Sequence, residues 1–134
     1  MPASVHVIEI QTQSDDAFYD LTPKVKSLVQ ASGAASGAVL IYCPHTTAGV
    51  TVQENTDPAL KDDLLGALAR MAPADGPWKH GEGNAHAHMK AALLGSSCTV
   101  PVENGKLLLG QWQAIYFVEF DGPRRRTVQV KVLA

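Results

Sequence analysis

The chain has 134 residues, of which 46% are hydrophobic and 18% are charged, and its formal net charge is -2 at pH 7. This length suits one domain covering residues 1–134, and it is too short for an eight-stranded α/β barrel of about 250 residues. The small net charge argues against a nucleic-acid partner, because a nucleic-acid-binding surface needs an excess of basic residues. The sequence has no apolar run of the roughly 18 residues that a membrane-spanning helix requires and no signal-peptide pattern, so we expect a cytoplasmic protein without a membrane partner.

The first residues predict a strand followed by a helix. Residues 4–12 alternate apolar and polar side chains in the manner of a half-buried strand. Thr22 then offers a helix cap and Pro23 a first-turn proline, and apolar residues follow at helical spacing. We expect this short helix to end at Gly33.

Two strands and a second helix are predicted next. Residues 37–43 form a continuous apolar run and residues 46–53 are rich in β-branched side chains, so we expect strands on both sides of a turn at Pro44. Asp57, followed by a proline, repeats the signal for the beginning of a helix. Leucines at helical spacing extend this helix to about Met71.

A loop and a third helix precede the last strands. Residues 73–83 contain several glycines and prolines and predict an irregular loop, the best candidate for a lid or a site loop. Asn84 offers a cap for a third helix that runs to Leu94, with Gly95 as its stop. The rest of the chain predicts an antiparallel meander, in which the Asn-Gly pair 104–105 forms a hairpin. The strands of the meander are expected at residues 98–102, 106–109, 115–120 and 127–133.

Histidines are concentrated in one short segment. His80, His86 and His88 are three of the five histidines in the chain, and imidazole is both the commonest transition-metal ligand and the side chain that titrates nearest to pH 7. If residues 84–94 are helical, His86 and His88 point about 200° apart, whereas Asn84 and His88 share a face. We therefore expect His88 in a site and His86 as an exposed residue of the first turn. If the segment were a strand, His86 and His88 would share a face and form an H-x-H metal pair.

Two further candidates flank the strand predicted at residues 46–53. His45 follows the proline turn, where a side chain can project from the end of a sheet into a cleft, although bonding to threonine or backbone groups explains it equally well. Glu54 follows the other end of the strand and has no structural explanation, so it is a candidate general base or metal carboxylate. Asp57, in contrast, is explained as a helix cap, and Asn55 could orient a ligand through its amide.

Five motifs occur in order along the chain: His45-Thr46-Thr47-Ala48-Gly49, Gln53-Glu54-Asn55-Thr56-Asp57-Pro58, Asn84-Ala85-His86-Ala87-His88, Gly105 to Gly110 followed by Gln111-Trp112-Gln113, and Glu119-Phe120-Asp121-Gly122-Pro123-Arg124. With these motifs the chain resembles the YjbQ family, also called UPF0047 and sometimes labelled a secondary thiamine-phosphate synthase. The resemblance covers nearly the whole chain, from the first predicted strand to the last.

The resemblance implies an α+β domain that is β-sandwich-like, with mostly antiparallel strands and about three short helices, and that assembles as a homotrimer. It also implies a polar cleft near the subunit boundary that can bind a metal, and a weak ability to join a pyrimidine diphosphate to a thiazole phosphate. That reaction releases diphosphate, so its site needs cations, normally magnesium together with Arg or Lys. We expect Arg124 and Arg126 to serve that role from an exposed basic turn that contributes little to stability.

These residues predict an enzyme that acts on a small phosphorylated molecule at a His- and Glu-rich site, with zinc or magnesium as the metal. Two alternatives remain open: a non-catalytic trimer that binds a metal or a ligand, and a metal-dependent hydrolase in which Glu54 is the base for a metal-bound water. The candidate catalytic residues are Glu54, Asn84 and His88, the candidate metal ligands are His45, His80 and His88, and the candidate substrate-binding residues are Asn55, Trp112, Arg124 and Arg126.

Overall fold

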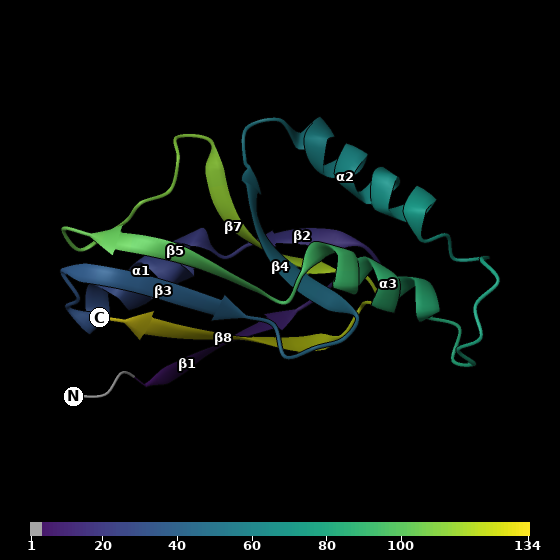
Figure 1. Ribbon diagram of the computed structural model, residues 1–134, viewed down its shortest axis with the longest axis horizontal. Helices are drawn as coiled ribbons and strands as arrows, with labels where there is room; N and C mark the ends of the chain where they lie inside the picture. Colours follow the sequence, from purple (N-terminus) through teal and green to yellow (C-terminus); the bar gives the residue numbers. More distant parts are fainter. Residues whose placement is uncertain (1–3) are drawn as a thin grey trace.

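The computed structural model describes residues 4–134, which form eight strands and three helices (Figure 1). The helices are α1 (Thr22–Ser32), α2 (Pro58–Met71) and α3 (Ala85–Leu94). None of them is long and apolar enough to cross a membrane. The strands are β1 (Val5–Gln11), β2 (Ala17–Asp20), β3 (Ser36–Tyr42), β4 (Ala48–Glu54), β5 (Ser97–Glu103), β6 (Lys106–Leu107), β7 (Gln113–Glu119) and β8 (Arg125–Leu133).

The strands are arranged in two antiparallel sheets. The larger sheet has the order β1-β8-β3-β5-β6 and the smaller one has the order β2-β7-β4. Their inner faces share one apolar core, in which Val39 and Val130 of the larger sheet pack in the same cluster as Phe117 of β7 and Val25 of α1. The α+β, β-sandwich-like fold with mostly antiparallel strands and three short helices is therefore confirmed.

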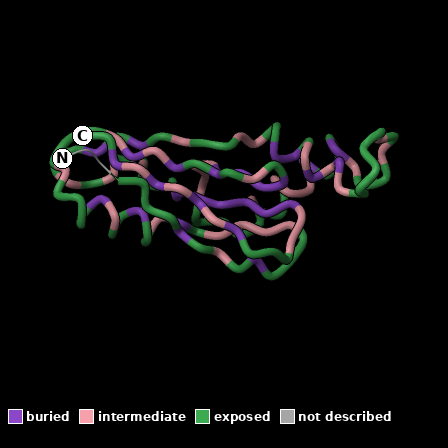
Figure 2. The backbone as a smooth tube through the Cα atoms, turned by 90° about the horizontal axis from the view of Figure 1, so that it is seen from below, coloured by how far each residue is buried: buried purple, intermediate pink, exposed green. Residues whose placement is uncertain are grey.

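A second core lies on the other face of the smaller sheet. Tyr116 of β7 and Phe120, which follows this strand, pack there with Leu68 of α2 and Ala91 of α3. Because side chains alternate along a strand, β7 is buried on both faces. Figure 2 shows uninterrupted buried stretches, in purple, running through the inside of the molecule. Burial of each large apolar side chain contributes about 1.5–3 kcal/mol, so β7 anchors both cores.

The predicted helices are confirmed, because their signals are local. Asp57 caps α2 by accepting a hydrogen bond from the backbone N–H of Ala59 at 3.0 Å, and Gly33 ends α1 in the left-handed conformation. The Asn104-Gly105 hairpin is also confirmed, since both residues have positive φ and join β5 to β6.

The meander predicted at the C-terminal end is wrong. β7 pairs with β2 and β4, whereas β8 pairs with β1 and β3, so residues 120–124 connect two sheets and do not form a hairpin. β7 is apolar on both faces, so other elements must pack on each face. A place beside β8 in the larger sheet would leave one of these faces uncovered. Strand β2 was not expected at all, because it is only four residues long.

Helix α3 lies close to the smaller sheet through a glycine contact. A Cβ atom added to Gly49 of β4 would lie 2.5 Å from the carbonyl oxygen of Gly95, the residue that ends α3. The same carbonyl accepts a hydrogen bond from the backbone N–H of Val50 at 3.2 Å. Only glycine at position 49 allows this approach, which holds the C-terminal end of α3 against β4.

We expect Gly49→Ala to lower the free energy of unfolding by about 1–3 kcal/mol, because the added methyl group meets backbone atoms that cannot move separately. Gly66→Ala is the matched control, because Gly66 lies inside α2 and its added Cβ would approach only the flexible Arg70 side chain, at 3.4 Å. That variant should gain about 0.5–1 kcal/mol from the higher helix propensity of alanine. Urea unfolding of both variants measures the difference, and equal midpoints would contradict the close contact.

Candidate functional site

The candidate residues lie in two groups at opposite ends of β4. His45 precedes this strand and Glu54 is its last residue, so its seven residues separate them by roughly 20 Å at the usual rise per residue. Asn55 and Trp112 lie at the Glu54 end, where the backbone N–H of Asn55 donates to the carbonyl of Trp112 at 2.9 Å. Trp112 is 55% exposed and does not belong to either core. One chain therefore does not bring Glu54, Asn55 or Trp112 to the histidines.

His45 and His88 line the same cavity at the other end of β4. The cavity has a volume of about 360 Å³ and lies between α3 and the beginning of β4, and no aspartate or glutamate lines it. The exposed His80 ring packs edge-on against the His88 ring, with centroids 5.0 Å apart. The structure thus brings together three of the predicted residues, one from each of three segments.

The position of His45 follows from the end of strand β3. The β3–β8 ladder ends at Tyr42 opposite Gln129, and if it continued for two residues, Pro44 would lie opposite Thr127. Proline has no N–H to donate, so the chain leaves the sheet there. The His45 ring takes over, with Nε2 lying 3.0 Å from the backbone nitrogen and 3.1 Å from the backbone oxygen of Thr127.

This contact selects the proton position on the neutral His45 ring. Because an orphaned buried N–H is rarer than an orphaned carbonyl, we assign Nε2 as the acceptor of the Thr127 N–H and place the proton on Nδ1. Among residues 4–134, Nδ1 has no hydrogen-bond partner, and it is not enclosed by protein. Burial, followed by the nearby charge of Arg126, lowers the pKa of His45 below its ordinary value, so the ring is a neutral N–H donor at pH 7.

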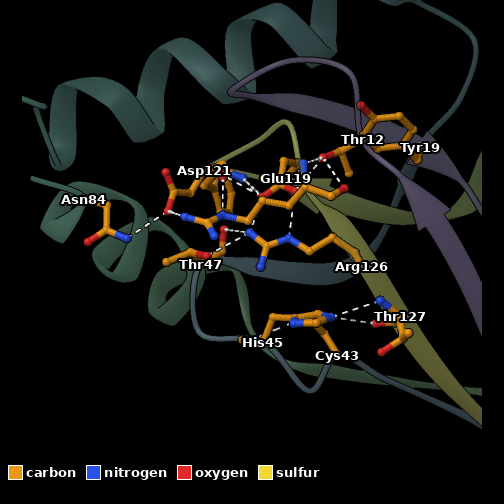
Figure 3. A network of polar contacts seen from close by, with 12 residues as sticks. Thr12, Tyr19, Cys43, His45, Thr47, Asn84, Glu119, Asp121, Arg126 and Thr127 are labelled. Carbon is orange, nitrogen blue, oxygen red and sulfur yellow. Dashed lines mark hydrogen bonds and ion pairs between the residues drawn. The ribbon is translucent and has the colours of Figure 1, made fainter. Parts of the chain in front are cut away.

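A buried ion pair between the two sheets lies beside His45 (Figure 3). Glu119 of β7 is fully buried, and Arg126 of β8 donates from Nε to its Oε2 at 2.7 Å and from Nη2 to its Oε1. The Thr12 hydroxyl also donates to Oε2, at 2.9 Å. Burial opposes ionisation of Glu119, but the hydrogen bonds from Arg126, the Asp121 N–H and Thr12 hold its pKa below the ordinary value. Glu119 is therefore a carboxylate at neutral pH.

The expectation for the basic turn is wrong for Arg126. Arg126 lies in β8 with its side chain pointing inward, only 5% exposed, so its removal would break a buried pair. Arg124 is exposed, as expected, and binds Asp121 through Nε to the carbonyl at 2.8 Å and through Nη2 to Oδ2 at 2.9 Å. The inward direction of Arg126 follows from the alternation that also buries Val128.

Asn84 and His86 differ from their predicted roles. Asn84 occupies the N-cap position of α3, but its side chain makes no capping bond, and Nδ2 donates to Oδ2 of Asp121 at 2.8 Å. This bond helps Arg124 to hold the pKa of Asp121 below its usual value, against the effect of burial. The prediction that His86 is exposed is wrong, because its ring is half-buried and its Nδ1 is enclosed without a partner, as is Oδ1 of Asn84.

The residues of one chain do not fit the expected zinc or magnesium ion. No group of three His, Cys, Asp or Glu side chains within the described range 4–134 could hold a metal. His45 already uses Nε2 on the Thr127 backbone, and Glu54 lies at the far end of β4.

The burial of Glu119 could have been predicted from the residues around it in the sequence. Residues 114–120 form an apolar run in which Glu119 is the only ionisable side chain apart from Tyr116. An acid inside such a run predicts a buried charge, which needs a cation on the facing strand. Arg126 meets that need, together with Thr12 and Thr47, which are both buried.

We expect the stability of the protein to fall when the pH is lowered from about 7 to 5, and part of this fall should depend on His45. Because its pKa is lower in the folded state than in the unfolded state, the unfolded chain binds the proton first. Chemical unfolding at a series of pH values should give a shallower slope for His45→Asn than for the wild type. Identical slopes would show that the ring is not held in its neutral form.

Comparisons with known proteins agree with the motifs. The family described as UPF0047 protein YjbQ-like matches residues 6–134. The UPF0047 protein YugU of Bacillus subtilis is 49% identical over 127 residues, which cover 94% of this chain and 96% of that protein. A UPF0047 protein of Methanocaldococcus jannaschii is 44% identical over 93% of this chain and 91% of its own length.

Solved structures have the same fold. An uncharacterized conserved protein of the YjbQ/UPF0047 family from Clostridium acetobutylicum superposes with a TM-score of 0.94 at 51% identity, over 96% of this chain and 99% of that one. A YbjQ-like protein of unknown function from Sulfolobus solfataricus gives a TM-score of 0.94 at 34% identity, over 98% and 97% of the two chains. With its motifs, its sheet order and these relatives, the chain belongs to the YjbQ/UPF0047 family.

Proposed function

We propose that the protein is an enzyme that binds a small phosphorylated molecule in the cavity lined by His45 and His88. The observation that carries this proposal is the contact of His45 Nε2 with the Thr127 backbone, which leaves Nδ1 as the N–H donor at a cavity without a lining carboxylate. A phosphate oxygen accepts such a hydrogen bond, and no acidic side chain lines the cavity to repel the anion.

The two histidines have different roles in this proposal. His45 cannot accept a proton from a ligand, because Nε2 is engaged with Thr127 and Nδ1 already carries hydrogen. Neither ring nitrogen of His88 has a hydrogen-bond partner within residues 4–134, and neither is enclosed. Both ring nitrogens of His88 are thus available to a ligand, while His45 donates a hydrogen bond to the oxygen on which charge develops.

Thiamine phosphate formation, which the resemblance implies, is the first reaction to assay. Both of its substrates carry phosphate groups, and the departing diphosphate needs hydrogen-bond donors and positive charge. His45 and the nearby Arg126 provide these within one chain. The metal-dependent hydrolase has less support, because Glu54, its predicted base, lies at the other end of β4.

The first test is calorimetric titration of the untagged protein with inorganic phosphate and with diphosphate, with and without added Mg²⁺, followed by a turnover assay with the pyrimidine diphosphate and the thiazole phosphate. Saturable binding of either anion supports the site, and turnover separates an enzyme from a non-catalytic binding protein. Absence of binding at millimolar anion would overturn the proposal.

We expect His88→Ala to weaken diphosphate binding by about tenfold or more, as is typical for the loss of one hydrogen bond to a charged group. His6→Ala is the control, because His6 lies on the exposed part of β1, outside the residues that line the cavity. It should bind the anion as the wild type does. Equal affinities for the two variants would remove His88 from the site.

We also propose the homotrimer that the resemblance implies. The face of the larger sheet that points away from the smaller one is uncovered and partly apolar, since Val5, Val7, Tyr42 and Leu133 are each more than 40% exposed. The strand registers place Val7, Gln129 and Tyr42 in one row across that face. A second copy of the chain is a natural cover for such a surface.

Light scattering at micromolar concentration should therefore give the mass of three chains. Val7→Lys should shift the species toward a single chain, because it places a charge on the uncovered apolar face. Glu103→Lys is the control, since Glu103 is an exposed residue on β5 of the same sheet. A wild-type protein with the mass of one chain would contradict the trimer.

A further inference from the structure

The Glu119–Arg126 pair lies where an ion pair is costly. Glu119 is fully buried and Arg126 is 5% exposed, and both side chains lie between the two sheets. Taking two charges out of water costs so much free energy that apolar side chains of similar size often replace a buried pair with no loss of stability. Stability alone therefore does not account for these two residues.

Arg126 uses only two of its three nitrogens inside the protein. Nε donates to Glu119, and Nη2 donates to Glu119 and, at 2.8 Å, to Oγ1 of Thr47. Nη1 has no hydrogen-bond partner among residues 4–134 and is not enclosed. Figure 3 shows Nη1 on the side of the guanidinium group that faces the His45 ring. The guanidinium group therefore keeps a free donor, which is held in a fixed direction.

The strand that carries Arg126 also positions His45. Arg126 holds the side chain of Thr47, and the backbone of the next residue, Thr127, holds the His45 ring. The segment from His45 to Thr47 is thus attached to β8 at two consecutive positions. The positive charge of Arg126 lies close enough to the His45 ring to lower the pKa of that ring.

From this geometry we infer that Glu119 is a positioning residue of the anion site. Its carboxylate fixes Arg126 through Nε and Nη2, so that Nη1 and the Nδ1–H of His45 donate together to an oxyanion of the ligand. The inference rests on the proposed function and adds a charged donor for the same phosphate group. Because Glu119 holds the guanidinium group in place before the ligand arrives, little entropy is lost when the ligand binds.

The test compares three variants by titration with inorganic phosphate and diphosphate. Glu119→Leu combined with Arg126→Met replaces the pair by apolar side chains of similar size, so the fold should persist while affinity falls about tenfold or more. Arg126→Lys keeps the charge beside Glu119 but loses the fork, and it should lose affinity to a similar extent. Arg125→Met is the matched control. Arg125 is next to Arg126 on β8, but its side chain is exposed and that of Arg126 points inward.

The outcomes separate the two proposals. If the wild type binds neither anion, the proposed function fails and this inference fails with it. If the wild type binds and the apolar double variant binds equally well, the cavity stands and the pair has only a structural role. If the double variant does not fold, Arg126→Lys decides, since unchanged affinity in that variant would equally overturn the inference.

A second measurement does not depend on any ligand. In the apolar double variant, the pKa of His45 followed by NMR should rise, because Arg126 lowers it more strongly than Glu119 raises it. Arg125→Met should leave it unchanged. An unchanged His45 pKa in the double variant would contradict the electrostatic link between the pair and the ring.

Discussion

A carboxylate that is fully buried between two sheets must be compensated, and much of this end of the molecule is arranged to do so. Glu119 receives hydrogen bonds from Arg126 of the facing sheet, from the Thr12 hydroxyl after β1 and from two backbone N–H groups that follow β7. Arg126 in turn holds Thr47, just ahead of β4. One charge thus orders three segments that are far apart in the sequence, and the segment before β4 is the one that carries His45.

The parts of the fold that could be predicted are those with local causes. Caps, first-turn prolines and terminal glycines mark helices within a few residues, and Asp57, Gly33 and the Asn104-Gly105 pair do so here. Strand pairing has no such local mark. A hairpin and a crossing between two sheets both leave two apolar runs separated by a turn, so β7 and β8 were wrongly joined. The buried double face of β7 was the available clue, because a strand that is apolar on both sides needs cover on both.

The candidate site was only partly accessible from the sequence for a related reason. Helix geometry separates His88 from His86, since it depends on residues two positions apart. The distance between His45 and Glu54 depends on the length of a whole strand, and that strand puts them at opposite ends of the smaller sheet. Arg126 was misread because three consecutive arginines look like an exposed turn, whereas the last two belong to β8 and the second of these points inward. Its partner Glu119 was visible in sequence only as an anomaly in an apolar run.

Pro44 shows how a residue without functional groups can create a functional one. Because it cannot donate a hydrogen bond, the β3–β8 ladder stops short and leaves the N–H and C=O of Thr127 open toward the place where the chain turns away. The His45 ring fills that gap, because its Nε2 lies within hydrogen-bond distance of both groups, as a paired strand residue would. Its other nitrogen, Nδ1, is thereby held in one direction. Because the ring is bonded to the backbone of β8, it is as rigid as the sheet, and its orientation is fixed before any ligand arrives.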